Sequence, residues 1–334
     1  MMKSQLIKPY IILWAVLGLL VAPGCEEDDG GDEKRAQEQR FYDLYISSTF
    51  KDTIPPPTGS GLHYIEITRG TGDMPDSDDW MIVNYIGYSL PNELVVDTYL
   101  ENVSVNDGIA NSEAYYGPFK MQNGSRTEGL TEGMQLMREG GEAIICFTSD
   151  LGYGTKGTQL MESVPGYTSL KYEVELVEVI KDIEAYEQAK IDSFVDTIEG
   201  VAAIQDPDSD AVMYYVVDVE APDGSRVMND SLVRVAYRGY LPDGREFDKS
   251  AEGEPLEFTV GDPSSGIITG WHLGVEKFRK GEKGRLVIPY QMAYGEQGKL
   301  SQALNYYAVQ PYETMVFDIE IVSVGGSTDS ELDP

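Results

Sequence analysis

The stretch that decides the fold is LVRVAYRGYLPDGREFDKS, which covers residues 232–250. Its first half alternates between an apolar face that includes Tyr237 and a face that carries two arginines, as a half-buried strand does. The Pro-Asp-Gly sequence at 242–244 predicts a tight turn, because proline presets φ and glycine tolerates positive φ. Phe247 and Asp248 follow directly, so a large apolar ring stands beside a carboxylate. A core ring next to a solvated acid is one explanation, and the rest of the chain has to decide whether it is the right one.

An internal repeat surrounds this stretch. LHYIEITRGTGDMPDSDDWMIVNYIGY (62–88) parallels VMYYVVDVEAPDGSRVMNDSLVRVAYRGY (212–240), and both copies end in Tyr-x-Gly-Tyr. Further on, EGLTEGMQLMREGGEAIICFTSDLGYG (128–154) parallels TGWHLGVEKFRKGEKGRLVIPYQMAYG (269–295). The sequence therefore predicts two homologous domains.

Each copy contains several strand patterns and one short helical pattern. In the second copy Trp271, Val275 and Phe278 recur at helical spacing, so one face of a short helix can cover a sheet. Each copy closes with an alternating strand, at 170–180 and at 315–324. We predict an α+β fold in which each domain is a curved antiparallel sheet wrapped on one short helix and preceded by a helical segment.

The N-terminal region differs from the two repeats. Two lysines precede a short apolar run, and small residues follow it before Cys25, which is typical of a secretory signal. Small residues directly before a cysteine also resemble the lipid-modification site of bacterial lipoproteins; an ordinary cleaved signal is the alternative. The predicted segments are a lipoprotein signal peptide (1–24), an acidic tether and helical segment (25–57), a first domain (58–181), a linker helix (182–200), a second domain (201–326) and a disordered tail (327–334).

Within the segment 25–57, six acids in the eight residues 26–33 predict a solvated tether. Residues 34–50 predict an amphipathic helix, and we expect one of its sides to carry Phe41, Leu44, Tyr45 and Ser48.

Composition excludes some classes of function. The chain has 334 residues with 57 acidic and 25 basic side chains, for a net charge of -32. Nucleic-acid binding needs clusters of Lys and Arg. The chain shows no such cluster, so we expect no nucleic-acid partner. The only cysteine besides Cys25 is Cys146, which lies in an apolar run and is expected to be a small buried residue without a disulfide.

Eight short motifs occur in order between residues 233 and 320. They are Val-x-Val-x-Tyr-x-Gly, Asp-Gly-x-x-Phe-Asp-x-Ser, Pro-x-x-Phe-x-x-Gly, Ile-x-Gly-Trp, Gly-Glu, Ile-Pro, Ala-Tyr-Gly and Phe-Asp-Ile-Glu. With them the second domain resembles FKBP-type peptidyl-prolyl cis-trans isomerases. The helical segment before each domain is similar to those of bacterial secreted members of the family.

The resemblance implies a proline-binding site in the second domain. Trp271 corresponds to the floor under the proline ring, and Asp248 to the rim near the rotating amide. The Ile268 backbone N–H and the Tyr294 hydroxyl correspond to donors for substrate carbonyls. The implied walls are Tyr237, Phe247 and Phe317, and the further substrate-binding residues are Ile267, Val309, Leu256 and Phe258.

This chain departs from the family pattern at several positions. Leu256 replaces a pocket Phe, and Gly253 stands where an Arg usually pairs with the pocket Asp. The first domain departs further, since Leu130 replaces the floor Trp and an extra stretch lies within 98–120. Further replacements in that domain are Val96, Tyr172, Arg126 and Thr127, whereas Tyr85, Asp97 and Tyr153 remain. We therefore expect catalysis in the second domain and a weak or inactive first domain.

The function that the resemblance implies is prolyl isomerisation that assists the folding of exported proteins. The reaction needs no cofactor, metal or nucleophile, because the catalyst has only to favour the twisted amide over the planar one. The expected partners are proline-containing unfolded polypeptides, together with a membrane through lipidated Cys25, which would anchor the chain to the bacterial cell envelope. The alternative is a non-catalytic chaperone or an interaction subunit of an envelope complex. The client, the oligomeric state and the side of the membrane stay open.

Overall fold

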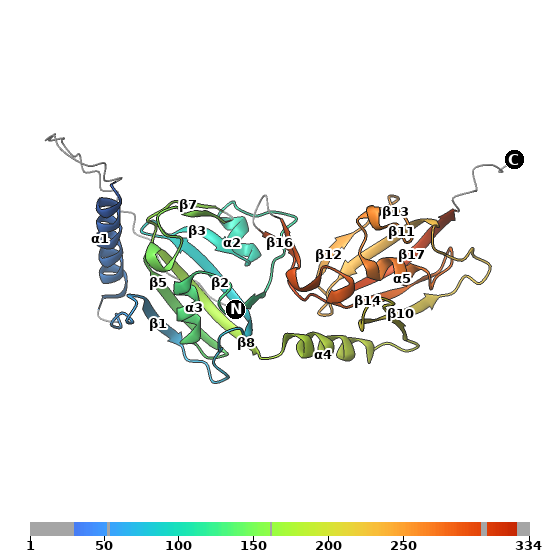
Figure 1. Cartoon of the computed structure of the whole chain (residues 1–334), viewed down its shortest axis with the longest axis horizontal. Helices are drawn as coiled ribbons and strands as arrows, with labels where there is room; N and C mark the ends of the chain where they lie inside the picture. The colour runs from blue at the N-terminus through green and yellow to red at the C-terminus, as the bar shows by residue number, and fades with distance from the viewer. Residues whose placement is uncertain (1–29, 52–53, 161, 302–305, 326–334) are drawn as a thin grey trace.

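The computed structural model describes residues 30–51, 54–160, 162–301 and 306–325. The predicted signal peptide, Cys25 and the predicted tail at 327–334 lie outside the described residues. Two sheet-containing domains lie side by side, and helix α4 (Ile183–Val195) runs along the junction between them (Figure 1). Asp182 begins α4 by accepting a hydrogen bond from the backbone N–H of Ala185 at 2.9 Å.

The first domain is built on a six-stranded antiparallel sheet. Its strands follow the order β1-β5-β8-β2-β3, and β4 pairs with β2 as well. Their bounds are β1 (His63–Thr68), β2 (Trp80–Ser89), β3 (Leu94–Thr98), β4 (Phe119–Gln122), β5 (Gly141–Phe147) and β8 (Leu170–Ile180). Three helices, α1 (Gly31–Phe50), α2 (Glu101–Asn106) and α3 (Glu128–Gln135), and a two-stranded ribbon of β6 (Thr158–Gln159) and β7 (Ser163–Val164) complete it.

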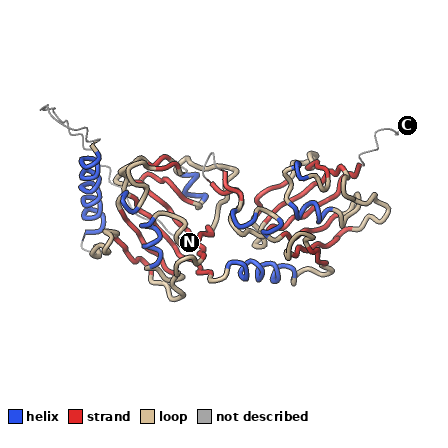
Figure 2. Tube along the Cα trace, viewed as in Figure 1, coloured by secondary structure: helices blue, strands red, loops and turns tan. Residues whose placement is uncertain are grey.

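The second domain repeats this arrangement. Its sheet follows the order β12-β11-β17-β14-β10-β9, and β13 pairs with β11. The strands are β9 (Ala202–Gln205), β10 (Val212–Val219), β11 (Leu232–Tyr240), β12 (Glu246–Lys249), β13 (Leu256–Thr259), β14 (Lys283–Ile288) and β17 (Met315–Gly325). A separate ribbon of β15 (Lys299–Ser301) and β16 (Tyr306–Val309) follows the sheet strand β14, and within the described residues from 201 onward the α-helix is α5 (Thr269–Val275). The predicted repeat and the α+β class are confirmed, and Figure 2 shows each sheet with its short helix.

The opening stretch forms the hairpin of β11 and β12. Leu241 and Arg245 are joined across the turn by a 2.9 Å backbone hydrogen bond, and Gly244 adopts the left-handed region with φ of 91°. The Pro-Asp-Gly turn thus occurs where it was predicted. It reverses the chain, so Phe247 and Asp248 lie on β12 beside β11.

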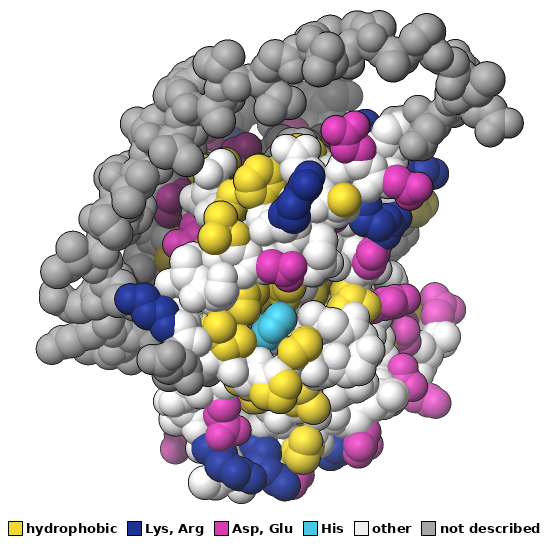
Figure 3. Space-filling model, turned by 90° about the vertical axis from the view of Figure 1, so that its left-hand side faces the viewer, with side chains coloured by type: hydrophobic (Ala, Val, Ile, Leu, Met, Phe, Trp, Pro, Cys, Tyr) yellow, Lys and Arg dark blue, Asp and Glu magenta, His cyan; other side chains and the backbone are white. Residues whose placement is uncertain are grey.

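Helix α1 differs from the prediction at its start and in its buried side. It begins at Gly31, so Asp32 and Glu33, which we assigned to the tether, form its first turn. Acidic side chains are favourable there, because the N-terminal end of a helix carries partial positive charge. Of the predicted side only Tyr45 is buried, whereas Phe41 and Leu44 are 47% and 64% exposed; Figure 3 views the molecule from this side.

The side of α1 that contacts the first domain is held by polar groups. Buried Glu38 accepts three hydrogen bonds, from the backbone N–H and the hydroxyl of Ser149 and from the hydroxyl of Ser169, at 2.6 to 2.8 Å. Tyr42 donates to the carbonyl of Cys146 at 2.8 Å. Ile46 is buried on the same side and packs with Tyr42, Tyr45 and Cys146, so apolar contacts add to these hydrogen bonds.

Cys146 is fully buried, as expected. Burial raises the pKa of its thiol to about 12, against the opposing effect of Lys171, so the thiol stays protonated at neutral pH. Among the residues that the structure describes, no helix is both long and apolar enough to cross a membrane.

Candidate functional site

An aromatic cluster forms on the helix side of the second domain's sheet. Trp271 comes from α5, Tyr237 from β11, Phe317 from β17 and Phe258 from β13. These side chains belong to one packed cluster, in which the rings of Tyr237, Phe317 and Phe258 each contact that of Trp271.

Trp271 lies at the centre of the cluster. Its ring centroid is 5.1 Å from that of Tyr237 and 5.1 Å from that of Phe317, and the ring planes are turned by 89° and 81°. Phe258 contacts it at 5.9 Å, and Phe247 contacts Phe317 at 5.6 Å. Edge-to-face contacts of this kind stabilise aromatic pairs beyond the area they bury. Trp271 is therefore packed edge to face between Tyr237 and Phe317.

Close packing of these rings requires Gly239 in the Tyr-x-Gly-Tyr motif. A Cβ atom at this position would lie 2.8 Å from the ring of Phe247 and 2.9 Å from that of Phe317. The φ of Gly239 is not in the left-handed region, so the backbone conformation does not require glycine here. Glycine is required because the two rings pack directly against the strand.

Asp248 lies at the exposed edge of the cluster. Its Oδ2 accepts a 2.7 Å hydrogen bond from the Tyr237 hydroxyl. Burial and this hydrogen bond raise the pKa of Tyr237, so the hydroxyl stays protonated and donates. The tyrosine thus orients a carboxylate that lacks the usual arginine partner.

All of the predicted site residues of the second domain come together. Phe258, Trp271, Val309 and Phe317 are buried in the cluster. The partly buried members are Tyr237, Phe247, Leu256, Ile267, Ile268 and Tyr294.

The rings fill more space than we expected of an open pocket. Only 3% of Trp271 is exposed, because the neighbouring rings cover most of it. The accessible part of the site is formed by the half-buried side chains of Tyr237, Phe247 and Tyr294, with Asp248 at the edge.

The equivalent position in the first domain is closed. Tyr85 donates to Asp97 at 3.0 Å, which repeats the Tyr237–Asp248 pair, but Asp97 is only 5% exposed. Arg126 covers the pair, with an ion pair to Asp97 at 3.8 Å, a hydrogen bond to the Tyr85 hydroxyl at 3.5 Å and its guanidinium 5.4 Å from the centre of the Phe119 ring. Burial raises the pKa of Asp97, although Arg126 and the Tyr85 hydroxyl oppose this shift. A charged side chain therefore lies over the pair that corresponds to Tyr237 and Asp248 in the second domain.

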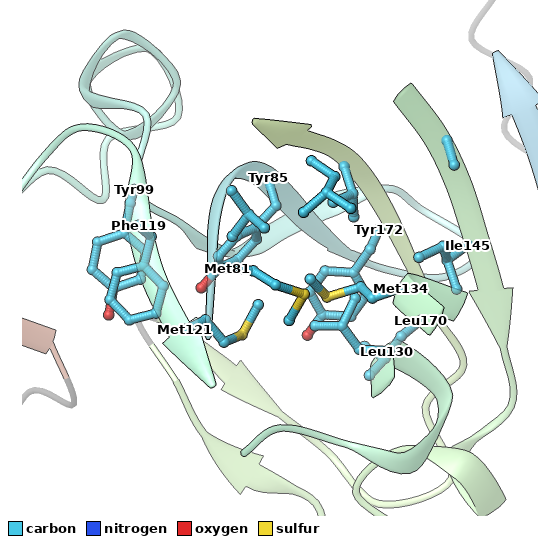
Figure 4. Close-up of a cluster of buried hydrophobic side chains, with 14 of the residues drawn as sticks. Met81, Tyr85, Tyr99, Phe119, Met121, Leu130, Met134, Ile145, Leu170 and Tyr172 are labelled. Carbon is cyan, nitrogen blue, oxygen red and sulfur yellow. The ribbon is translucent and has the colours of Figure 1, made fainter. Parts of the chain in front are cut away.

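Sequence reasoning missed two aromatic residues in this domain. Val83 and Val235 are equivalent positions in the two repeats. Phe119 is the strand partner of Val83, and Leu256 is the strand partner of Val235. The first domain therefore keeps a Phe at the position where the second has Leu256. Tyr99 stacks on Phe119 with centroids 4.0 Å apart. Figure 4 shows these two rings beside Tyr85, and Leu130 in the same buried cluster. The extra stretch within 98–120 hid this correspondence, because it shifts Phe119 along the chain.

The fold and the aromatic site define the class of protein. The family model of the FKBP-type peptidyl-prolyl cis-trans isomerases matches residues 72–177 and 224–322, which together make up more than half of the chain. The chain belongs to this family.

Named relatives match only part of the chain. FkpA of Escherichia coli (strain K12), an FKBP-type isomerase, is 37% identical over 127 residues, which are 38% of this chain and 42% of the relative. A probable FkpA of Neisseria meningitidis serogroup B is 36% identical over 104 residues, 31% of this chain and 35% of the relative. The crystal structure of Escherichia coli FkpA is 33% identical and covers 44% of this chain and 61% of that chain, with a TM-score of 0.34. The chain thus spans about two fifths of the length of the curated relatives it matches.

Proposed function

We propose that the chain is a peptidyl-prolyl cis-trans isomerase whose second domain carries the catalytic site and acts on proline-containing unfolded polypeptides. The observation that carries the proposal is the arrangement of Trp271, Tyr237 and Phe317 with Asp248 at its edge. Membership of the isomerase family supports it.

The chemistry requires little beyond an aromatic surface of suitable shape. Resonance holds an X-Pro amide planar with a barrier of about 18–20 kcal/mol, and each tenfold acceleration requires about 1.4 kcal/mol of preferential binding of the twisted form. A twisted amide has lost resonance and suits a less polar setting. In the proposed mechanism the rings around Trp271 hold the proline, the Ile268 N–H and the Tyr294 hydroxyl hold neighbouring carbonyls, and Asp248 lies near the carbonyl of the rotating amide.

We propose in addition that the first domain is weak or inactive. Leu130 supplies no aromatic floor, and Arg126 keeps a charge over the buried Tyr85–Asp97 pair. Such a site cannot give a proline ring apolar surroundings without displacing the guanidinium.

Matched tyrosine variants of the full chain test both proposals. The wild type should accelerate isomerisation of a proline peptide above its spontaneous rate. Tyr237→Phe should lower kcat/KM roughly two- to tenfold, because it removes a hydrogen bond worth about 0.5–1.5 kcal/mol. Tyr85→Phe removes the equivalent hydroxyl of the first domain and should leave kcat/KM unchanged. A loss of kcat/KM confined to Tyr85→Phe would indicate that catalysis takes place in the first domain. A wild type that does not accelerate isomerisation would contradict the isomerase proposal.

A second candidate function is non-catalytic binding of unfolded chains. A cavity of about 500 Å³ lies between the domains, and it favours this candidate because aromatic side chains of both domains line it. These are Trp80, Tyr99, Phe119, Tyr307 and Tyr312. Aromatic side chains offer large apolar area to an extended polypeptide.

For the cell we propose export to assist folding of exported proteins, with a lipid on Cys25 anchoring the chain to the bacterial cell envelope, at the outer membrane. Cells that express the full chain in the presence of a labelled fatty acid should yield labelled protein in the membrane fraction. Cys25→Ser should abolish the label and release the protein, because no other cysteine lies near the end of the apolar run. An unlabelled wild type would favour an ordinary cleaved signal.

A further inference from the structure

The first domain contacts the edges of the second domain's candidate site. One of these edges is β16 and the loop after it, which supplies Val309 to the aromatic cluster. The other edge is the turn between β11 and β12, which directly precedes Phe247 and Asp248. Both edges meet the segment 113–120 of the first domain.

Tyr115 makes the central contacts to both edges. Its backbone N–H donates to the Tyr307 carbonyl on β16 at 2.6 Å. Its hydroxyl hydrogen-bonds the guanidinium of Arg245 in the turn, and that guanidinium lies 5.0 Å from the centre of the Tyr115 ring. One residue of the first domain therefore holds two separate segments of the second.

Apolar packing follows the same path. Leu241, at the start of the turn, is 4% exposed and belongs to the buried cluster of the first domain. Phe247 packs against the clusters of both domains, so this candidate wall of the proline site is supported from two sides. Tyr307 packs on Phe119 with ring centroids 5.7 Å apart.

Buried charges fix the position of this interface. Lys120 of β4 is 2% exposed, and its Nζ lies 2.6 Å from Glu187 of α4 and 3.5 Å from Glu313, which precedes β17. The same amine donates to the carbonyl of Pro311 at 3.1 Å, in the loop that follows β16. Lys190 completes the group, so two ammonium groups balance two carboxylates. Such a group tolerates little displacement, because a buried charge that loses its partner is strongly unfavourable.

We infer that Tyr115 of the first domain is a positioning residue for the isomerase site of the second. Its backbone N–H binds β16, the strand that carries Val309. Its side chain holds the turn that precedes Phe247 and Asp248. The inference rests on the proposed function, and it gives the first domain the role of positioning the site of the second. The site is completed across the domain interface, through the segment 113–120.

The test compares three variants of the full chain. Tyr115→Ala should lower kcat/KM for a proline peptide about fivefold, with most of the change in KM, because the turn that precedes Phe247 and Asp248 is no longer held through Arg245. Tyr115→Phe keeps the ring beside Arg245 and should retain at least half of the wild-type value. Tyr116→Ala, which removes the neighbouring ring, should match the wild type, because only the Tyr116 carbonyl is seen to contact Arg245. Hydrogen exchange of residues 241–245 should become faster in Tyr115→Ala alone, because alanine keeps the backbone N–H that binds Tyr307 but loses the side-chain contacts to Arg245.

The outcomes separate the inference from the function on which it rests. An active wild type together with unchanged kcat/KM in Tyr115→Ala overturns the inference and leaves the isomerase proposal intact. Equal losses in Tyr115→Ala and Tyr116→Ala overturn it as well, since a general loosening of the segment would then explain them. A wild type without activity overturns the proposed function, and unchanged exchange at 241–245 in Tyr115→Ala in that case overturns the side chain's part in holding the turn.

Discussion

Replacing Lys120 by Met is expected to lower the free energy of unfolding by about 3–5 kcal/mol, the cost of removing one partner from a buried ion pair. The variant leaves Glu187 and Glu313, 1% and 4% exposed, with only Lys190 as a cation nearby. It also removes the amine that donates to the carbonyls of Pro311 and Tyr312. Urea-induced unfolding, followed by tryptophan fluorescence, measures the change.

The control for this prediction is Lys283→Met. Lys283 is 2.7 Å from Glu320, but their side chains are 52% and 40% exposed. An exposed pair contributes about 0–1 kcal/mol, so this variant should unfold almost as the wild type does. The double variant Lys120→Met with Glu187→Met should regain part of the lost stability, because it also removes an uncompensated carboxylate. Equal effects of the two single lysine variants would show that the interface charges contribute no more than surface charges.

Replacing Trp271 by Leu is expected to lower kcat/KM for proline isomerisation roughly ten- to a hundredfold. This is a loss of about 1.4–2.7 kcal/mol of transition-state stabilisation. Leucine keeps the site apolar but removes the indole ring that Tyr237 and Phe317 contact. The first domain already has leucine at this position, in Leu130, so the variant makes the second domain resemble the first. The measurement is the catalysed rate with the full chain.

Phe278→Leu serves as the matched control. Phe278 is also a buried aromatic residue of the second domain, and its ring packs against that of Tyr215 on β10, with centroids 6.1 Å apart. It should lose stability and keep kcat/KM. If Trp271→Leu keeps its activity as well, the floor assignment is wrong. If it loses isomerisation but still suppresses aggregation of an unfolded protein, catalysis and binding reside in different parts of the chain.

Local patterns predicted the second domain well. Alternation along 232–240 placed Tyr237 on the face that meets Trp271, and the Pro-Asp-Gly turn placed Phe247 beside Gly239. These relations depend on the period of a strand and on turn chemistry, both of which are written in adjacent residues.

Other features could not be predicted because they depend on side-chain direction or on contacts far apart in the sequence. Arg126 was recognised as a replacement for an apolar residue, but nothing in its neighbourhood shows that it covers Asp97. Lys120 and Glu187 are separated by 67 positions and would each pass as surface charges. The register of β4 had to be observed before Phe119 could be matched with Leu256.

The early start of helix α1 has a consequence for orientation. Only residues 26–30 separate Cys25 from Gly31, and an extended chain covers at most about 3.6 Å per residue, so Cys25 can lie no further than roughly 20 Å from the start of α1. A lipid on Cys25 would keep the beginning of α1, and the domain packed on it, near the bilayer. Because the buried charges around Lys120 hold the second domain on the side away from α1, the proposed catalytic surface would be presented at a distance from the lipid headgroups (Figure 1). Such an enzyme would meet its polypeptides in the aqueous space beyond the membrane surface.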